Sequence, residues 1–346
     1  MPHEPIDLRS DAVTRPTEAM WEAMQRATPG WAAANDDRHV HELEQYAAEL
    51  LGKEAALFMP TGSMANLTML MASVERGEQI ILEQSSHMLW SEEWALGYIC
   101  GAIPRLLPSH DGCPDPEAVR SAIVERYFSH RPNTALVCLE NSHNVAGGIA
   151  IPTARIAQVA EVAHAHGIAV HLDGARLCNA AVALDEPPAN LAAPADSVAI
   201  SLSKGLSAPY GALLIGSTQL IDRARSALKR LGGHSVPNAG IFAAAALIAL
   251  RDMRARLGQD HQRARNLANA LAGLPGLELN LQSVQTNIIL VRTTRLSAAE
   301  LLTRLAERGL LASSLTDDIV RLVTHRHIGD EEVARAITAF HLTLEA

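Results

Sequence analysis

The sequence predicts an α/β fold in which a mostly parallel central sheet is followed by a small C-terminal α+β domain. Two observations lead to this prediction. Short apolar runs alternate with helix-length amphipathic stretches from about residue 40 to residue 250, which is typical of a parallel sheet covered by helices. After residue 250 this alternation stops. We therefore expect a large domain over residues 1–250, which includes an N-terminal arm, and a small domain over residues 251–346.

The strands of the large domain are expected where apolar runs are short and end at small or polar residues. Buried parallel strands have this character because both of their faces are covered. The runs are Ala55–Met59, Gln79–Glu83, Ala135–Glu140, Ile168–Leu172, Ser197–Leu202 and Ala212–Ile215. Between two of them, Thr153–His166 carries apolar residues at helical spacing and predicts a covering helix.

The C-terminal part begins after two long helical stretches. Ile241–Leu250 is rich in alanine, and Arg251–Ala272 is charged; both predict helices. A strand at Asn287–Arg292, a helix at Ala298–Arg308 and a strand at Ile319–Thr324 then indicate a separate α+β unit.

Composition excludes several functional classes. The chain has 346 residues, 48% of them hydrophobic and 19% charged, as in ordinary globular proteins. Its net charge of −9 argues against nucleic acid as the main partner. The longest apolar run, Ile241–Leu250, is too short to span a bilayer, and the N-terminus has no signal pattern. The cysteines are scattered without metal-type spacing, so we expect reduced thiols, no metal site and a cytoplasmic protein; they are Cys100, Cys113, Cys138 and Cys178.

Ligands of open parallel sheets bind at the carboxyl ends of the strands, so the polar residues that follow the strands are the first candidates for a site. After the first strand, Thr61-Gly62-Ser63 opens an apolar helix. Free backbone N–H groups and hydroxyls at a helix start suit a phosphate. The same residues would also serve as an ordinary helix N-cap.

An acid follows the fourth predicted strand. Asp173 stands where a carboxylate could meet the N–H of a pyridine ring and keep that ring electron-accepting. Arg176 offers a planar fork for a substrate carboxylate. The alternative is a structural Asp–Arg pair at the rim of the sheet.

A lysine follows the fifth predicted strand. Burial at this position would lower the pKa of Lys204 and favour a Schiff base. A solvated strand end is the alternative. Ser201 and Lys204 also match the Ser-x-x-Lys signature of serine β-lactamases, but neither Ser-Asp-Asn nor Lys-Thr-Gly occurs in the chain.

Together the three segments indicate a cofactor. An anion-binding turn, an acid at a later strand end and a lysine about 30 residues further on are the parts that a pyridoxal 5′-phosphate (PLP) site needs, and Lys204 follows Asp173 by 31 positions. We therefore predict that Lys204 holds PLP as a Schiff base and that Asp173 pairs with the pyridine nitrogen.

Several longer motifs carry a family resemblance. The chain resembles the low-specificity L-threonine aldolases of the aromatic amino-acid β-eliminating lyase group, which are PLP enzymes with the aspartate-aminotransferase fold (fold type I). The resemblance covers nearly the whole chain. The matching stretches are Asp7-Leu8-Arg9-Ser10-Asp11, Val13-Thr14-Arg15-Pro16, Gly52-Lys53-Glu54-Ala55-Ala56, Pro60-Thr61-Gly62, Glu140-Asn141-Ser142-His143-Asn144, Leu172-Asp173-Gly174-Ala175-Arg176, Leu202-Ser203-Lys204-Gly205-Leu206 and Val320-Arg321-Leu322-Val323-Thr324-His325.

The resemblance implies roles for individual residues. Lys204, His87, His130 and Asp173 would be catalytic, with His87 over the cofactor ring and His130 as a second active-site histidine. The substrate carboxylate would be held by Ser10, Arg176 and Arg321. The expected cofactor contacts are Thr61, Gly62, Ser63, His87, Asp173, Arg176, Ser201 and Lys204. The family also implies a homodimer or homotetramer with shared active sites.

Two departures from the family pattern stand out. The tyrosine of the family's Gly-Asp-Asp-Val-Tyr-Gly loop is replaced by Ala34, and the arginine of its Met-Arg-Gln segment, which reaches a phosphate in the neighbouring subunit, is replaced by Pro237. A lost charge-assisted hydrogen bond costs about 1.5–3 kcal/mol, so cofactor affinity would fall unless His234 or Ser235 takes over.

The leading functional hypothesis is retro-aldol cleavage of a β-hydroxy-α-amino acid, such as threonine or allo-threonine, to glycine and an aldehyde. His87 and His130 are candidate bases, since imidazole titrates near neutrality, and a bound water is a competitor for that role. Two alternatives stay open: β-elimination or another reaction at Cα of an amino acid with a larger side chain, and a degenerate family member that serves as a binding or scaffold protein.

Overall fold

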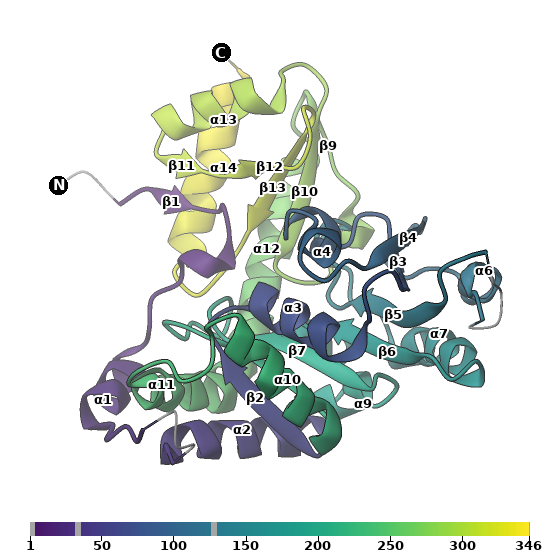
Figure 1. Ribbon diagram of the computed structural model, residues 1–346. Helices are drawn as coiled ribbons and strands as arrows, with labels where there is room; N and C mark the ends of the chain where they lie inside the picture. The colour runs from purple at the N-terminus through teal and green to yellow at the C-terminus, as the bar shows by residue number, and fades with distance from the viewer. Residues whose placement is uncertain (1–3, 32–35, 126–129, 346) are drawn as a thin grey trace.

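A seven-stranded sheet forms the centre of the protein (Figure 1). The computed structural model describes residues 4–31, 36–125 and 130–345. The strand order in the sheet is β2-β8-β7-β6-β5-β3-β4. The strands are β2 (Ala55–Met59), β3 (Gln79–Glu83), β4 (Ile103–Leu107), β5 (Thr134–Glu140), β6 (Ala169–Asp173), β7 (Ser197–Ser201) and β8 (Ala212–Gly216).

The strand directions bring polar residues together at the edge of the sheet that is formed by the carboxyl ends of the parallel strands. Among the described strands of this sheet, β8 alone runs antiparallel to its neighbours. Met59 and Ser201, the last residues of β2 and β7, both pair with Ala212 of β8. Asp173, at the end of β6, lies opposite Glu140 at the end of β5. The carboxyl ends of these parallel strands therefore meet along the same edge.

The six predicted strands of the large domain are confirmed, two of them with the same ends and the others with ends displaced by one residue. The mostly parallel sheet is confirmed as well. Strand β4 was not predicted. It lies at the sheet edge, its residues alternate between exposed and partly buried, and it contains Pro104. Such a strand lacks the continuous apolar run of a central one, and proline is tolerated at an edge.

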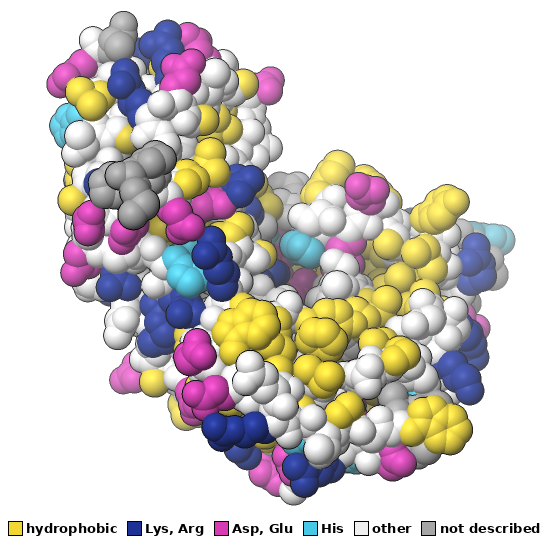
Figure 2. All heavy atoms as spheres, turned by 90° about the vertical axis from the view of Figure 1, so that its left-hand side faces the viewer, with side chains coloured by type: hydrophobic (Ala, Val, Ile, Leu, Met, Phe, Trp, Pro, Cys, Tyr) yellow, Lys and Arg dark blue, Asp and Glu magenta, His cyan; other side chains and the backbone are white. Residues whose placement is uncertain are grey.

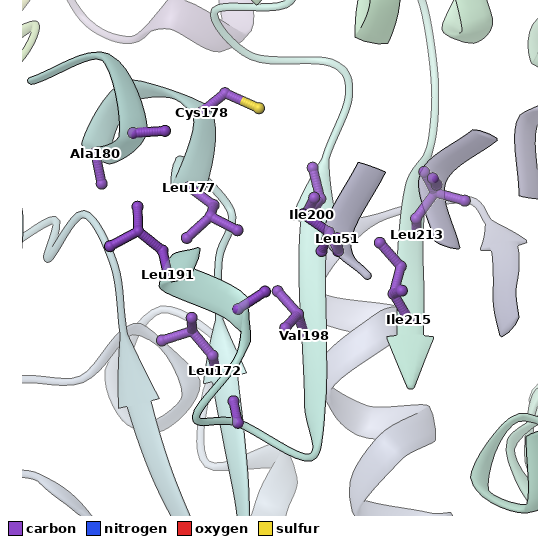
Figure 3. Packing of buried hydrophobic residues seen from close by; sticks show 14 of the residues in the cluster. Leu51, Leu172, Leu177, Cys178, Ala180, Leu191, Val198, Ile200, Leu213 and Ile215 are labelled. Atoms are coloured by element: carbon purple, nitrogen blue, oxygen red, sulfur yellow. The ribbon is translucent and has the colours of Figure 1, made fainter. Parts of the chain in front are cut away.

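Helices cover both faces of the sheet. One face packs against α2 (Arg38–Leu51), α7 (Thr153–Ala165), α8 (Leu177–Leu184), α9 (Pro188–Ala192) and α11 (Ala239–Asp252), and the other against α3 (Gly62–Ser73) and α10 (Thr218–Arg230). Alternation along β2 directs Phe58 into the first core, and Leu57 and Met59 into the second. Figure 3 shows part of the first core, where Val198 and Ile200 of β7 lie near Leu213 and Ile215 of β8.

The remaining helices of this part are short or peripheral. They are α1 (Glu18–Arg26), α4 (His87–Trp90), α5 (Ala95–Tyr98) and α6 (Pro116–Ala122). No helix within the described ranges is both long enough and apolar enough to cross a bilayer.

The C-terminal part has its own sheet and core. The sheet is antiparallel, in the order β12-β13-β10-β9, and three helices pack beside it. Its elements are α12 (Leu257–Leu271), β9 (Leu277–Glu278), β10 (Ile288–Thr293), α13 (Ala298–Glu307), β11 (Leu310–Leu311), β12 (Ser313–Ser314), β13 (Ile319–Val323) and α14 (Asp330–Leu344). The predicted helix and two strands of this part are confirmed.

The N-terminal segment packs with the C-terminal part. Strand β1 (Ile6–Asp7) pairs in parallel with β11, and Ile6 and Leu8 belong to the core of the C-terminal sheet. Helix α12 reaches both cores, because Leu257 packs in the large one and Leu267 in the small one. A domain boundary at residue 250 stays a prediction.

The turn between β7 and β8 needs glycine at position 211. Gly211 has φ +111°, and a Cβ at this position would clash with the Phe58 ring. We expect Gly211→Ala to lower the free energy of unfolding by about 3 kcal/mol or more, from backbone strain and overpacking together. Gly167→Ala is the control, since its φ is +69° with nothing within 4 Å of the added Cβ; strain alone costs about 1–2 kcal/mol there. Urea unfolding measures both, and equal losses would contradict the packing argument.

Candidate active site

The candidate site lies at the edge where the parallel strands of the central sheet end. Asp173 and Glu140 are the last residues of adjacent strands, and Ser201 ends the next strand beyond β6. The molecule is hollowed between its two parts, and histidine and acidic side chains line the hollow (Figure 2).

Asp173 is a buried, fixed and ionised carboxylate. Its Oδ1 accepts a hydrogen bond from the Ala175 N–H at 3.1 Å, and its Oδ2 accepts one from Asn66 Nδ2 at 2.9 Å. Burial opposes its charge, but His87, Lys204 and the hydrogen bond from Asn66 together hold the pKa of Asp173 below its ordinary value. The carboxylate therefore stays negative at neutral pH.

His87 lies next to Asp173 at the start of α4. Its backbone N–H donates to Glu140 Oε2 at 2.9 Å, which fixes the turn that precedes the helix. The ring Nδ1 is 3.3 Å from Glu92 Oε1 and 3.9 Å from Asp173 Oδ2. Burial alone would lower the pKa of His87, but the Glu92 contact and the charge of Asp173 raise it. His87 can therefore carry a proton near neutral pH.

Lys204 follows β7 by a short turn. Its carbonyl oxygen accepts hydrogen bonds from Thr14 Oγ1 at 2.9 Å and from the Ser207 N–H at 2.8 Å, which hold the lysine backbone in place. Burial and the nearby charge of Arg176 lower the pKa of the Lys204 amine. A lowered pKa increases the neutral fraction of the amine, and the neutral form is the nucleophile.

A buried ion pair holds Arg176. Its Nε and Nη2 donate to the two carboxylate oxygens of Asp11 at 2.9 and 2.7 Å. Asn287 Nδ2 also donates to Asp11, at 3.3 Å. Burial opposes ionisation of Asp11, but Arg176 holds its pKa far below the ordinary value. Arg176 is thus committed to Asp11 through two of its three nitrogens, and its Nη1 reaches Asn144 Oδ1 at 3.3 Å.

Arg321, on β13, reaches the same asparagine from the C-terminal part. Its Nη1 donates to Asn144 Oδ1 at 3.0 Å and its Nη2 to the Arg9 carbonyl oxygen at 3.1 Å. Its Nε is buried and has no hydrogen-bond partner within the described part of the chain. Ser10, next to Arg9, caps the turn Asp11–Val13 by accepting from the Ala12 N–H.

The predicted phosphate turn begins a helix next to the end of β7. Thr61 is the N-cap of α3, and its Oγ1 accepts from the Met64 N–H at 3.1 Å. The first N–H groups of a helix have no acceptor within the helix, which leaves those of Gly62 and Ser63 for an anion. A Cβ on Gly62 would lie 4.0 Å from the Cβ of Ser201, so this turn adjoins the strand that leads to Lys204.

His171 lies on the same face of β6 as Asp173, and both contact Asn66. This histidine is two residues before Asp173 on β6 and fully buried. Its Nδ1 is 2.8 Å from Ser197 Oγ, and its Nε2 is 3.0 Å from Asn66 Oδ1. Burial lowers the pKa of His171 to about 4, so the ring is neutral at physiological pH.

Comparison with known proteins shows the family of the chain. The family described as beta-eliminating lyase matches residues 7–294. Low-specificity L-threonine aldolase 1 of Arabidopsis thaliana is 38% identical over 341 residues, which cover 97% of this chain and 95% of that protein. The low specificity L-threonine aldolase of Escherichia coli (strain K12) is 38% identical over 330 residues, 95% of this chain and 96% of that protein. The chain belongs to the beta-eliminating lyase family.

A solved structure agrees in fold. The threonine aldolase of Leishmania major superposes with a TM-score of 0.84 at 21% identity, over 98% of this chain and 100% of that one. The fold expected from the resemblance, that of PLP-dependent fold type I enzymes, is confirmed.

One residue implied by the family resemblance is not brought to the site. His130 is exposed and precedes β5, near the amino ends of β3 and β5, where the Asn133 carbonyl accepts from the Gln79 N–H. Asp173 lies at the carboxyl ends, on the opposite edge of the sheet. Within one chain, the structure does not bring His130 beside Asp173 and Lys204, and its catalytic role stays a prediction. A matching motif gives only the position of a residue in the sequence. Whether that residue lies near the amino or the carboxyl ends of the strands depends on where the neighbouring strand begins.

Of the two positions that depart from the family pattern, the structure describes only Pro237. Ala34 falls outside the described residues. Pro237 lies in the loop between α10 and α11, which contains left-handed residues at Ser235 (φ +66°) and Asn238 (φ +59°). His234 Nδ1 and Ser235 Oγ are 2.6 Å apart in this loop, so both polar groups engage each other.

Sequence reasoning missed five polar residues that complete the site. These residues form hydrogen bonds with predicted site residues or with one another, and none was predicted to be a site residue. They are Asp11, Asn66, Glu92, Glu140 and Asn144. One of them carried a usable signal, because Glu140 ends a predicted strand just as Asp173 nearly does. The others meet their partners only through the folding of distant segments.

The low pKa of His171 predicts an acid-dependent loss of stability. The folded pKa is about 4 against an ordinary value of 6.5. Between these values the unfolded chain binds more protons, so stability is present above pH 6.5 and falls as the pH drops towards 4. We expect His171→Gln to lose about 2 kcal/mol less free energy of unfolding than wild type between pH 7 and pH 5. Urea unfolding at both pH values checks this, and identical losses would contradict it.

Proposed function

We propose that this protein is a PLP-dependent lyase that cleaves β-hydroxy-α-amino acids of the threonine type into glycine and an aldehyde, acting as a homodimer or homotetramer. The observation that carries the proposal is that four functional side chains lie together at the carboxyl ends of the parallel strands. An amine with a lowered pKa, Lys204, and an ionised carboxylate, Asp173, both lie at this edge with two arginines that converge on one point.

The residues present fit PLP. Lys204 would bind the aldehyde of the cofactor, Asp173 would hold the proton of its ring nitrogen, and the start of α3 at Gly62 and Ser63 would bind its phosphate. His87, which would lie beside the bound cofactor, has a buried Nδ1 that makes no hydrogen bond of good geometry among the described residues, although Glu92 Oε1 lies 3.3 Å away. When bound, PLP supplies a ring that accepts electrons from the substrate carbon.

The arginines would orient the substrate. Arg321 has a buried Nε that no described group satisfies, and an unsatisfied buried donor costs about 1–3 kcal/mol. A substrate carboxylate would satisfy it. Arg176 would contribute through Nη1, since its other nitrogens bind Asp11. A fixed substrate carboxylate would set which bond at Cα is perpendicular to the plane of the cofactor ring. That orientation would decide which bond breaks.

His87 is the candidate to accept the β-hydroxyl proton. Its raised pKa and its contact with Glu92 allow it to hold a proton during the reaction. A bound water is a competitor of His87 for this role, and His130 stays a candidate that the arrangement within one chain does not support.

Product analysis tests the function. We expect purified protein with PLP to release glycine and the matching aldehyde from threonine, allo-threonine or a β-aryl serine. Lys204→Ala should lower turnover at least a thousandfold, because it removes the covalent attachment. The exposed Lys229→Ala is the matched control and should act as wild type. Pyruvate or ammonia instead of aldehyde would favour β-elimination, and no product from any substrate would contradict the proposal.

A second prediction concerns Arg321. Loss of a charge-assisted hydrogen bond is worth about 1.5–3 kcal/mol, so we expect Arg321→Ala to raise KM roughly ten- to a hundredfold. Arg292→Ala is the control, since Arg292 lies on the adjacent strand β10, is exposed and pairs with Asp318. Steady-state kinetics with threonine measures both variants. An unchanged KM in Arg321→Ala would show that this guanidinium does not bind substrate.

A further inference from the structure

A chain of buried hydrogen bonds runs behind the candidate site. It starts at Ser197 on β7, passes through His171 on β6 and reaches Asn66 on α3. From Asn66 it divides. Asn66 Nδ2 is 2.9 Å from Asp173 Oδ2 and 2.8 Å from Glu92 Oε1. All three residues of the chain are buried, so these contacts are shielded from water.

The direction of each hydrogen bond in this chain follows from the two carboxylates. A carboxylate is an acceptor, so both hydrogens of Asn66 Nδ2 are used by Asp173 and Glu92. The carbonyl Oδ1 of Asn66 then faces His171 and requires a donor, which fixes the proton of His171 on Nε2. His171 Nδ1 accepts from the Ser197 hydroxyl. A reversed amide would place its oxygen against the two carboxylates, and both of those hydrogen bonds would be lost.

The two carboxylates that Asn66 holds face different partners. Asp173 lies at the edge of the sheet where the PLP ring would lie, and Glu92 lies 3.3 Å from His87 Nδ1. Burial and the charge of Asp173 raise the pKa of Glu92. Two buried carboxylates that approach each other repel, and a donor between them reduces that repulsion.

We propose that Asn66 is a positioning residue that holds Asp173 for the cofactor ring and Glu92 for His87, and that His171 fixes the orientation of its amide. This proposal rests on the proposed PLP function. It assigns Asn66 no contact with substrate or cofactor. Its effect passes through the two carboxylates, so its loss would weaken both the hold on the ring and the hold on the proton-carrying histidine.

The test uses PLP binding to the full-length protein, with thermal unfolding of the cofactor-free protein as a check of folding. We expect Asn66→Ala to raise the Kd for PLP roughly tenfold or more, since two hydrogen bonds to charged groups are lost. Asn133→Ala is the matched control. Asn133 also donates to a carboxylate, Glu78 Oε1 at 2.7 Å, but near the amino ends of the strands, away from the site. The Kd of Asn133→Ala for PLP should therefore equal that of wild type.

A pair of His171 variants tests the orientation claim independently. The amide N–H of a glutamine can replace the Nε2–H donor, whereas phenylalanine fills the space without any donor. We expect His171→Gln to keep the Kd for PLP within about threefold of wild type, and His171→Phe to raise it as Asn66→Ala does. The absorbance band of the bound cofactor should change in the same two variants, because it is sensitive to the groups that surround the cofactor.

The outcomes separate this inference from the proposed function. If wild-type protein does not bind PLP, the proposed function fails. If wild type binds PLP and both Asn66→Ala and His171→Phe bind equally well, the function stands and the positioning role is wrong. Equal weakening in His171→Gln and His171→Phe would also overturn it, since a purely structural residue gives no rescue by a donor. If Asn66→Ala does not fold, the His171 pair still decides.

Discussion

The buried ion pair between Asp11 and Arg176 is the contact on which the geometry of the site depends. Asp11 belongs to the N-terminal segment, Arg176 follows the central strand β6, and Asn287 of the C-terminal part donates to the same carboxylate. One buried charge therefore joins three regions of the chain. Because an uncompensated buried charge costs several kcal/mol, these regions are held in a single arrangement, and the arginines, Lys204 and Asp173 keep their relative positions.

The surroundings of the site have opposite effects on the charges of Lys204 and Asp173. Burial and Arg176 lower the pKa of Lys204, while His87 and Lys204 help to keep Asp173 ionised despite burial. The same surroundings thus favour a neutral nucleophile and a negative partner for a ring nitrogen. Asn144 accepts from both arginines and marks the point on which their positive charge converges.

The sequence was sufficient for the buried strands of the central sheet and for the residues that follow their ends, because burial of parallel strands and helix spacing leave local patterns; the edge strand β4 leaves no such pattern. Asp173 and Lys204 were found in this way. It was insufficient for contacts such as Asp11 with Arg176 and Asn66 with Asp173, which join residues 165 and 107 positions apart. Neither local spacing nor residue type predicts them. The place of His130 in the fold was unpredictable for a related reason, since its motif gave no information about the end of the sheet near which it would lie.

The N-terminal segment has one consequence for handling the protein. Between β1, which pairs with β11, and Thr14, which bonds the backbone of Lys204, the chain carries Asp11. A protease cut just after Thr14 would separate β1, the counter-ion of Arg176 and the side chain that binds the Lys204 backbone from the rest of the chain. Resistance of the amino-terminal arm to digestion is therefore a measure of whether the catalytic assembly is intact.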